Sequence, residues 1–160
     1  MPWMTIRISA GILLYRRTGG RLETLLAHPG GPLFAHRDEG YWSIPKGEPD
    51  GDEVLLDVAM REFAEETGHP VPDGPVVGLG SITQKGGKVV FAWAAEGDMD
   101  PADSVSNTFE MTWPPKSGQT ASFPEIDRVA WFDAAAARIR IKETQIPFLE
   151  RLEAAVGEPA

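Results

Sequence analysis

The second half of the predicted helix over residues 53–67 carries three glutamates in a spacing typical of one helix face. Glu62, Glu65 and Glu66 stand at positions i, i+3 and i+4, which lie together because each helical residue turns the chain by about 100°. Apolar residues form two separate stripes on the same helix, so we expect other parts of the protein to cover it on two sides. At least one face that carries carboxylates is therefore predicted to point inward.

Carboxylates that face a protein interior repel one another, and removing them from water is costly unless a cation compensates. Oxygen ligands on adjacent helical turns suit Mg²⁺ or Mn²⁺, whose remaining ligands are waters and substrate phosphates. The alternative is that the three glutamates lie on the solvated surface of an acidic protein, which has 24 Asp and Glu against 15 Lys and Arg. The residues that surround the helix decide between these interpretations.

The composition narrows the classes of function. The 160 residues predict one domain over 1–160. A formal charge of −9 argues against nucleic-acid polymers and anionic membranes as partners, because both select clustered positive charge. The absence of cysteine excludes disulfides, thiolate zinc sites and cysteine nucleophiles. No apolar run approaches the ~18 residues of a membrane span, and no cleavable signal sequence is evident, so we expect a cytoplasmic protein.

The rest of the chain is predicted to alternate strands with loops and to end in helices, the first of them capped by Asp133. Residues 29–46 are rich in glycine and proline and are expected to form a packed loop that borders a functional site. Prolines between 101 and 124 mark a second irregular region. We therefore expect an α/β or α+β domain with a mixed sheet. The expected strands are 5–15, 21–28, 76–83, 88–95 and 128–132.

The residues around the three glutamates match a known motif. Gly47 is followed after five residues by Glu53, and after seven more by Arg61-Glu62-Phe63-Ala64-Glu65-Glu66-Thr67-Gly68. This pattern over 47–69 resembles the signature of the Nudix hydrolases. His69 departs from the pattern, which usually has an aliphatic residue there, but no ligand position is affected. The resemblance implies the family's α/β/α sandwich with a mixed β-sheet.

The resemblance also implies a metal site on the motif. The carbonyl of Gly47 and the carboxylates of Glu62, Glu65 and Glu66 are the implied ligands of Mg²⁺ or Mn²⁺, and Glu65 is implied as a catalytic residue as well. The metal would neutralise a pyrophosphate and activate a water.

Glu53 and Arg61 complete the motif and are expected to support catalysis. Arg61 can pair with an acid and hold the geometry between the loop and the helix, which aims the metal ligands. The alternative for Arg61 is an ordinary i,i+4 ion pair with Asp57 or Glu65, and the two arrangements can coexist.

A further glutamate outside the motif is often a ligand or a base in MutT-type and dinucleoside-polyphosphate members of the family. Glu125 lies six residues before Trp131 and is expected to fill this role, both as a metal ligand and in catalysis. Glu110 is the rival candidate, and the third alternative is that both lie on the surface. Their geometry must decide.

Four residues are expected to bind substrate. Lys46 precedes the motif glycine as in dinucleoside tetraphosphate hydrolases and could contact a terminal phosphate. Gln84 and Lys88 flank a predicted hairpin turn near a cleft. Trp42 could stack on a base, although core packing is the alternative for any one tryptophan.

The resemblance implies a hydrolase in which water attacks a phosphoanhydride bond of a nucleotide. The expected substrates are dinucleoside polyphosphates or nucleoside triphosphates, oxidised ones included. Alternatives are an ADP-ribose or nucleotide-sugar pyrophosphatase and a module that binds a nucleotide and regulates a partner without turnover. The complete motif argues against the module, because a binder gains nothing obvious from all of these residues. The expected partners are a small nucleotide and, as a candidate, a second copy of the chain.

Overall fold

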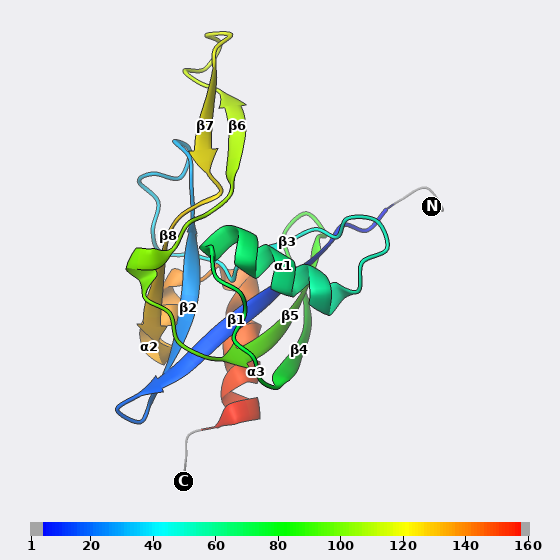
Figure 1. The fold of residues 1–160 in the computed structure, drawn as a ribbon, viewed down its shortest axis with the longest axis vertical. Helices are drawn as coiled ribbons and strands as arrows, with labels where there is room; N and C mark the ends of the chain where they lie inside the picture. Colours follow the sequence, from blue (N-terminus) through cyan, green and yellow to red (C-terminus); the bar gives the residue numbers. More distant parts are fainter. Residues whose placement is uncertain (1–4, 158–160) are drawn as a thin grey trace.

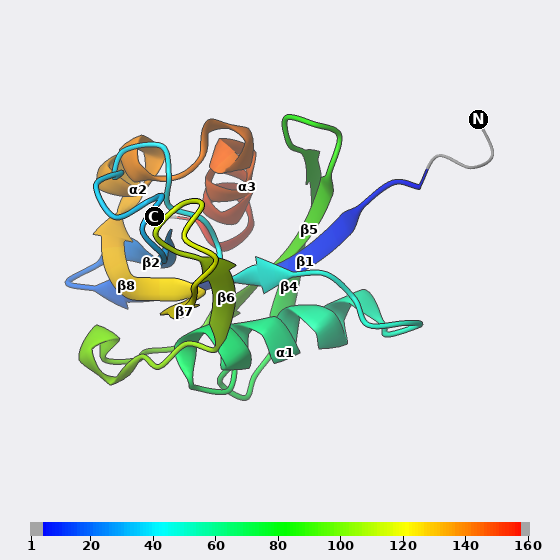
Figure 2. The same cartoon turned by 90° about the horizontal axis from the view of Figure 1, so that it is seen from above.

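The computed structural model describes residues 5–157 and has three layers, with a sheet between helices (Figure 1, Figure 2). The strands are β1 (Ile8–Thr18), β2 (Arg21–Pro29), β3 (Lys46–Gly47), β4 (Val76–Thr83), β5 (Val89–Glu96), β6 (Thr108–Thr112), β7 (Thr120–Pro124) and β8 (Ile126–Asp133). The helices are α1 (Leu55–Thr67), α2 (Ala134–Arg140) and α3 (Ile146–Val156), with short 3₁₀ turns η1 (Pro101–Asp103) and η2 (Glu143–Gln145). Helix α1 covers one face of the sheet, and α2 and α3 cover the other. The expected α+β sandwich with a mixed sheet is confirmed.

Strand β1 is the centre of the main sheet, whose order is β4-β5-β1-β2-β8. It runs parallel to β5 and antiparallel to β2, which makes the sheet mixed. Its residues are buried from Ser9 to Tyr15, because helices cover both of its faces. Successive side chains therefore enter two cores: Ile12 and Leu14 pack with α1, whereas Leu13 and Tyr15 pack on the side of α2 and α3.

Strands β1 and β2 separate from each other along their length (Figure 1). They pair close to the hairpin turn that joins them, and the segment 42–47 fills the gap that opens beyond it. At the end of this segment, β3 pairs with Ala10 and Gly11 of β1. Ser43 exchanges two backbone hydrogen bonds with Ala27 of β2, at 2.8 and 3.0 Å. The segment is thus held by both strands.

The expected elements of the sandwich appear with their ends shifted by up to three residues. Helix α1 begins at Leu55, because Val54 is extended, and ends where Gly68 adopts a left-handed φ of 77°. Asp133 caps α2 as predicted, and accepts a hydrogen bond from the Ala136 N–H at 2.9 Å. Within residues 5–157, no helix has both the length and the apolarity to span a membrane.

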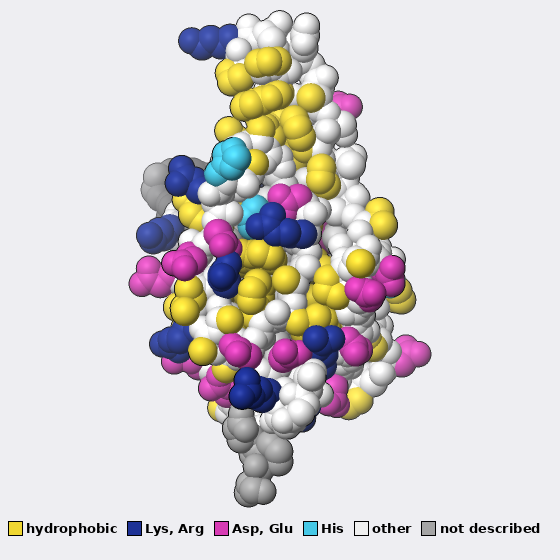
Figure 3. Space-filling model, turned by 90° about the vertical axis from the view of Figure 1, so that its left-hand side faces the viewer, with side chains coloured by type: hydrophobic (Ala, Val, Ile, Leu, Met, Phe, Trp, Pro, Cys, Tyr) yellow, Lys and Arg dark blue, Asp and Glu magenta, His cyan; other side chains and the backbone are white. Residues whose placement is uncertain are grey.

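The prediction of an irregular region between residues 101 and 124 is wrong in part. Strands β6 and β7 form a hairpin that projects from the body of the molecule (Figure 1). Phe109 and Met111 alternate with exposed residues along β6, with the period of two that defines a strand. Pro114 and Pro115 lie in the turn rather than in either strand. Hydrophobic side chains gather over this end of the molecule (Figure 3).

Replacing Phe63 by alanine should lower the free energy of unfolding by about 3–5 kcal/mol, because Phe63 is 1% exposed in the core beneath α1. Phe34→Ala is the matched control: Phe34 is 37% exposed, and its loss should cost less than about 1 kcal/mol. Urea unfolding followed by circular dichroism measures both changes. Equal losses in the two variants would contradict the placement of this core.

Candidate functional site

The segment 42–47 brings the backbone of Gly47 against α1. A Cβ atom on Gly47 would overlap the carboxylate of Glu62, so a residue with a side chain fits here only if that carboxylate moves. Gly11 of β1 is similarly crowded, because its Cβ would lie 2.5 Å from the carbonyl oxygen of Pro45. The two glycines allow the strand, the loop and the helix to meet, and they leave the backbone of residue 47 beside the Glu62 carboxylate.

Glu62 and Glu66 form a pair of enclosed carboxyl groups on α1. Glu66 is only 7% exposed. Burial raises the pKa of Glu66 to about 9, with added contributions from the charge of Glu62 and a hydrogen bond to it. Burial also raises the pKa of Glu62, helped by the charge of Glu65. Two acids so placed favour a shared proton or a bound cation between them.

Arg61 holds the outer side of the same cluster. Its guanidinium donates two hydrogen bonds to Glu53, at 2.8 and 3.0 Å, a bidentate geometry that lowers the pKa of Glu53. It also donates to Glu62 at 3.0 Å, to Glu65 at 3.2 Å, and to the backbone carbonyl of Glu48 at 3.2 Å. The i,i+4 pair with Glu65 and the link between loop and helix are therefore both present.

The implied metal ligands are brought together only in part. Glu62 and Glu66 meet beside Gly47, whereas the Glu65 side chain is 40% exposed and engaged with Arg61. In the part of the chain that the structure describes, no three acidic or histidine side chains form a compact cluster for an ion. The residues nevertheless fit a hard cation, because the enclosed pair consists of oxygen donors that hold a proton which a cation can replace.

The β6–β7 hairpin is attached to the C-terminal end of α1 by backbone hydrogen bonds. Asn107 N–H donates to the Glu65 carbonyl at 2.8 Å, and Glu125 N–H donates to the Asn107 carbonyl at 2.8 Å. The first of these bonds uses the Glu65 carbonyl at the helix end, which has no partner within the helix. After burial and the effects of Glu62, the charge of Glu125 adds to the raised pKa of Glu66. Glu125 is thus placed within electrostatic reach of the enclosed pair.

Glu110, the rival of Glu125, lies on the hairpin itself. It is an exposed residue of β6 and pairs with Ser122 of β7. Among the described residues, its charge is not one of the main contributions to the pKa of Glu62 or Glu66.

Three lysines, Lys46, Lys88 and Lys142, lie within electrostatic reach of one another near Glu66. Burial, together with the charges of Lys88 and Lys142, lowers the pKa of Lys46 to about 8, whereas the charge of Glu66 acts in the opposite sense. Burial also lowers the pKa of Lys142, again with a contribution from Lys88. The sequence predicts Lys46 and Lys88 here but not Lys142, which lies between α2 and η2 and has no local pattern that marks it.

A cavity of about 470 Å³ opens beside Lys142. Its walls come from the loop after β2, the turn after β4 and the connection between α2 and α3, which lie on the same side of the sheet (Figure 2). Phe34 and Tyr41 contribute two aromatic rings, whose centroids are 6.2 Å apart. Gln84, one of the predicted substrate-binding residues, also lines it.

The prediction that Trp42 stacks on a base is wrong, because Trp42 belongs to the core. The residue is 3% exposed, and its indole N–H donates to Asp38 at 2.8 Å. The rings of His28 and Phe132 contact it edge-on, with centroid distances of 5.1 and 4.9 Å. A ring enclosed in this way has no free face for a ligand.

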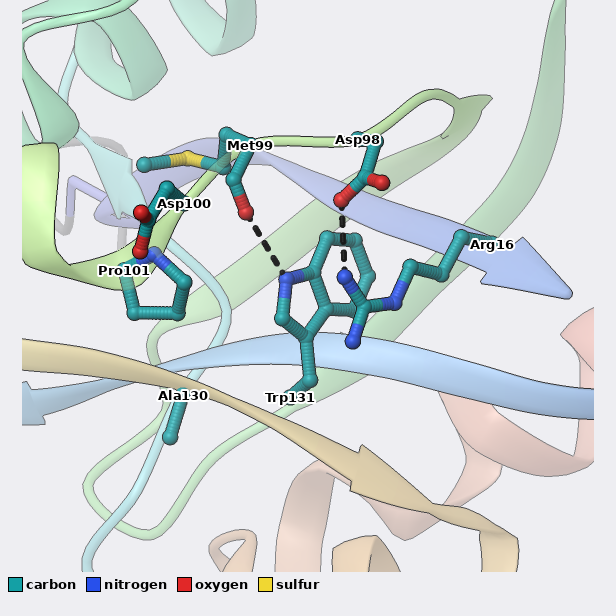
Figure 4. Close-up of a pocket in the computed structure, with 7 residues that line it drawn as sticks. All are labelled: Arg16, Asp98, Met99, Asp100, Pro101, Ala130 and Trp131. Carbon is teal, nitrogen blue, oxygen red and sulfur yellow. Dashed lines mark hydrogen bonds and ion pairs between the residues drawn. The ribbon is translucent and has the colours of Figure 1, made fainter. Parts of the chain in front are cut away.

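A second cavity, of about 620 Å³, is lined by Arg16, Asp98 and Trp131 among others (Figure 4). There Arg16 lies over the ring of Trp131, 4.1 Å from its centroid, and donates to Asp98 at 2.7 Å. Arg16 is six residues along β1 from Ala10, the partner of Gly47, or roughly 20 Å at ~3.3 Å per residue. The motif residues do not line this cavity.

Comparison with known proteins gives one curated relative with a partial match. The 8-oxo-(d)GTP phosphatase of Mycolicibacterium smegmatis is 40% identical over 80 residues, which are 46% of this chain and 23% of that protein. The match therefore spans about a quarter of the relative's length.

Solved structures share the fold. The NUDIX domain of Shewanella oneidensis NrtR, crystallised with ADP ribose, has a TM-score of 0.65 at 16% identity and covers 97% of this chain and 91% of its own. A C. elegans Ap4A hydrolase has a TM-score of 0.61 at 21% identity, with coverage of 92% and 97%.

The family model described as the NUDIX domain matches residues 5–152, a range that contains Gly47, Arg61 and the glutamates of α1. Because this match extends over most of the chain, the protein belongs to the NUDIX family.

Proposed function

We propose that this protein hydrolyses a phosphoanhydride bond of a nucleoside polyphosphate with the help of Mg²⁺ or Mn²⁺. The observation that carries the proposal is the enclosed pair of Glu62 and Glu66 beside the backbone of Gly47. Like charges are stable in such a place only when a proton or a cation compensates them. Oxygen donors of this kind prefer hard divalent ions.

A bound divalent ion would supply charge neutralisation and an acidified water. Arg61 holds the Glu53 carboxylate against the helix, and it would release Glu65 when that carboxylate turns toward the ion. The residues that would hold the ion are Gly47, through its carbonyl, and Glu62, Glu65, Glu66 and Glu125.

The lysines and the cavity give the substrate an orientation. The charges of both Glu66 and Lys142 contribute to the pKa of Lys46, and Lys142 lines the cavity. Positive charge therefore connects the carboxylates with the cavity, as a polyphosphate requires in a protein of net charge −9. The rings of Phe34 and Tyr41 offer apolar surface for a base at the far end.

Glu125 is the group that we assign to remove a proton from the attacking water. Its main chain is fixed at the end of α1, while its side chain stays exposed and free to reach a water near Glu66.

The names of the relatives suggest which substrates to test first. The 8-oxo-(d)GTP phosphatase and the Ap4A hydrolase favour nucleoside triphosphates, oxidised ones included, and dinucleoside polyphosphates. The NrtR domain with ADP ribose makes that compound the alternative. Product release from these three classes, with Mg²⁺, with Mn²⁺ and with EDTA, tests the proposal. No turnover on any of them, together with nucleotide binding, would favour a regulatory module.

Glu66→Gln should lower metal-dependent turnover by roughly 10²–10³-fold, because it removes a carboxylate that compensates the ion. The free energy of unfolding should not fall, because the raised pKa leaves Glu66 uncharged near neutral pH and a glutamine amide can likewise donate a hydrogen bond to Glu62. Phosphate release and urea unfolding measure the two effects. Glu153→Gln, on the exposed face of α3, is the control and should behave as wild type. Wild-type turnover in Glu66→Gln would refute the proposed metal site.

Glu125→Gln should lower kcat by about 10²-fold or more, the usual effect of losing a general base, whereas Glu110→Gln should leave kcat within about twofold. Each variant removes one exposed carboxylate and the same charge, so a difference between their kcat values reports the effect of position alone. Steady-state kinetics at saturating Mg²⁺ gives the values. The reverse order would transfer the role to Glu110.

A further inference from the structure

A chain of hydrogen bonds with a fixed direction links the interior to the cavity beside Lys142. It starts at Gln145, which is fully buried where η2 meets α3. The backbone N–H of Ile44 donates to the side chain of Gln145, with 3.1 Å between the nitrogen and Oε1. Because a backbone N–H can only donate, the atom that faces it must be the amide oxygen of Gln145.

The amide nitrogen of Gln145 must therefore donate on its other side. It lies 2.9 Å from Oγ of Ser43 and 3.2 Å from Oε1 of Gln84. Ser43 is ready to accept, because its hydroxyl donates to the carbonyl of Ile44 at 2.8 Å. The atom of Gln84 that faces Gln145 must likewise be an oxygen, since two NH₂ groups cannot bond to each other.

This assignment determines what Gln84 offers to the cavity. With its oxygen bonded to Gln145, the NH₂ group of Gln84 lies on the opposite branch of the amide, and Gln84 lines the cavity. Within residues 5–157, the hydrogen bonds of the protein give that NH₂ group no acceptor. The backbone of Gln84 is held in place as well, because its N–H donates to the carbonyl of Lys88 at 2.8 Å.

We propose that Gln145 is a positioning residue that makes Gln84 a hydrogen-bond donor to the base, so that the site selects purines with an oxygen at position 6. The proposal rests on the proposed function, since it assumes that the cavity holds the base of the substrate. A 6-oxo group accepts from the Gln84 NH₂, whereas a 6-amino group meets it donor against donor and leaves both unpaired. Glu39 and Glu143, which also line the cavity, supply acceptors for the protonated N1 of an oxopurine.

The test separates recognition of the base from hydrolysis. IMP and AMP contain no phosphoanhydride bond, so calorimetry with Mg²⁺ present measures their binding without turnover. ITP and ATP carry the same two bases and report kcat/KM. Wild type should bind IMP at least about tenfold more tightly than AMP, the effect of one hydrogen bond in an enclosed site, and should show the same preference in kcat/KM.

Two substitutions should reverse this preference by different routes. Gln84→Glu keeps an oxygen for Gln145 and presents a second oxygen to the cavity, so AMP should bind about tenfold more tightly than IMP. Gln145→Glu can only accept, so it should turn the unchanged Gln84 amide around and give the same reversal. A purely structural role of Gln145 would weaken both ligands equally. Gln119→Glu, in the hairpin turn, adds the same charge and should keep the wild-type ratio.

The outcomes distinguish the two proposals. An IMP-to-AMP ratio near one in wild type, or a ratio that Gln84→Glu leaves unchanged, overturns the inference even if nucleotides are hydrolysed. The expected ratios without hydrolysis of ITP or ATP would support the inference and refute the proposed function. Should Gln145→Glu fail to fold, Gln84→Glu decides, because it leaves the buried amide intact.

Discussion

The burial of Glu62 and Glu66 side by side is the constraint on which the arrangement of the site depends. Burial raises the pKa of both groups, so the fold holds them together against their preference for water. Two neighbouring residues each compensate part of this cost: Arg61 donates a hydrogen bond to Glu62, and the positive charge of Lys46 lowers the pKa of Glu66. A bound cation would lower the free energy of a site that is strained electrostatically in this way.

The same site depends on an interruption of the sheet. If β1 and β2 paired along their full length, the segment 42–47 would have no place between them, and Gly47 could not reach α1. Where the two strands separate, they lose their backbone hydrogen bonds to each other. The segment replaces part of these bonds, through Ser43 to β2 and through β3 to β1. The long glycine-rich loop is therefore part of the sheet at one end and part of the cavity wall at the other. One connection therefore positions both Gly47 beside α1 and the aromatic rings that line the cavity.

The sequence predicts α1 and the strands of the main sheet because their patterns are local. It fails for the β6–β7 hairpin, where prolines in the turn hide a strand period that Phe109 and Met111 carry. It fails for Trp42 because the same side chain suits a core and a stacking surface, and only the contacts with His28 and Phe132 distinguish them. Lys142 and Gln145 could not be identified from the sequence, since residues far away in the chain are their neighbours in the fold. The roles of the motif residues remain predictions that the geometry supports.

The position of β1 has a consequence for how the chain acquires its structure. Ile8 pairs with Val89, and the ladder between β1 and β5 runs from there to Glu96. During synthesis this central strand, which is buried from Ser9 to Tyr15, thus keeps one open edge until β2, β3, α1, β4 and β5 have all been made. Closing so long a loop delays folding, and an open apolar edge invites pairing with other nascent chains. Aggregation on the ribosome is accordingly the hazard that this topology creates, and it ends when β5 arrives.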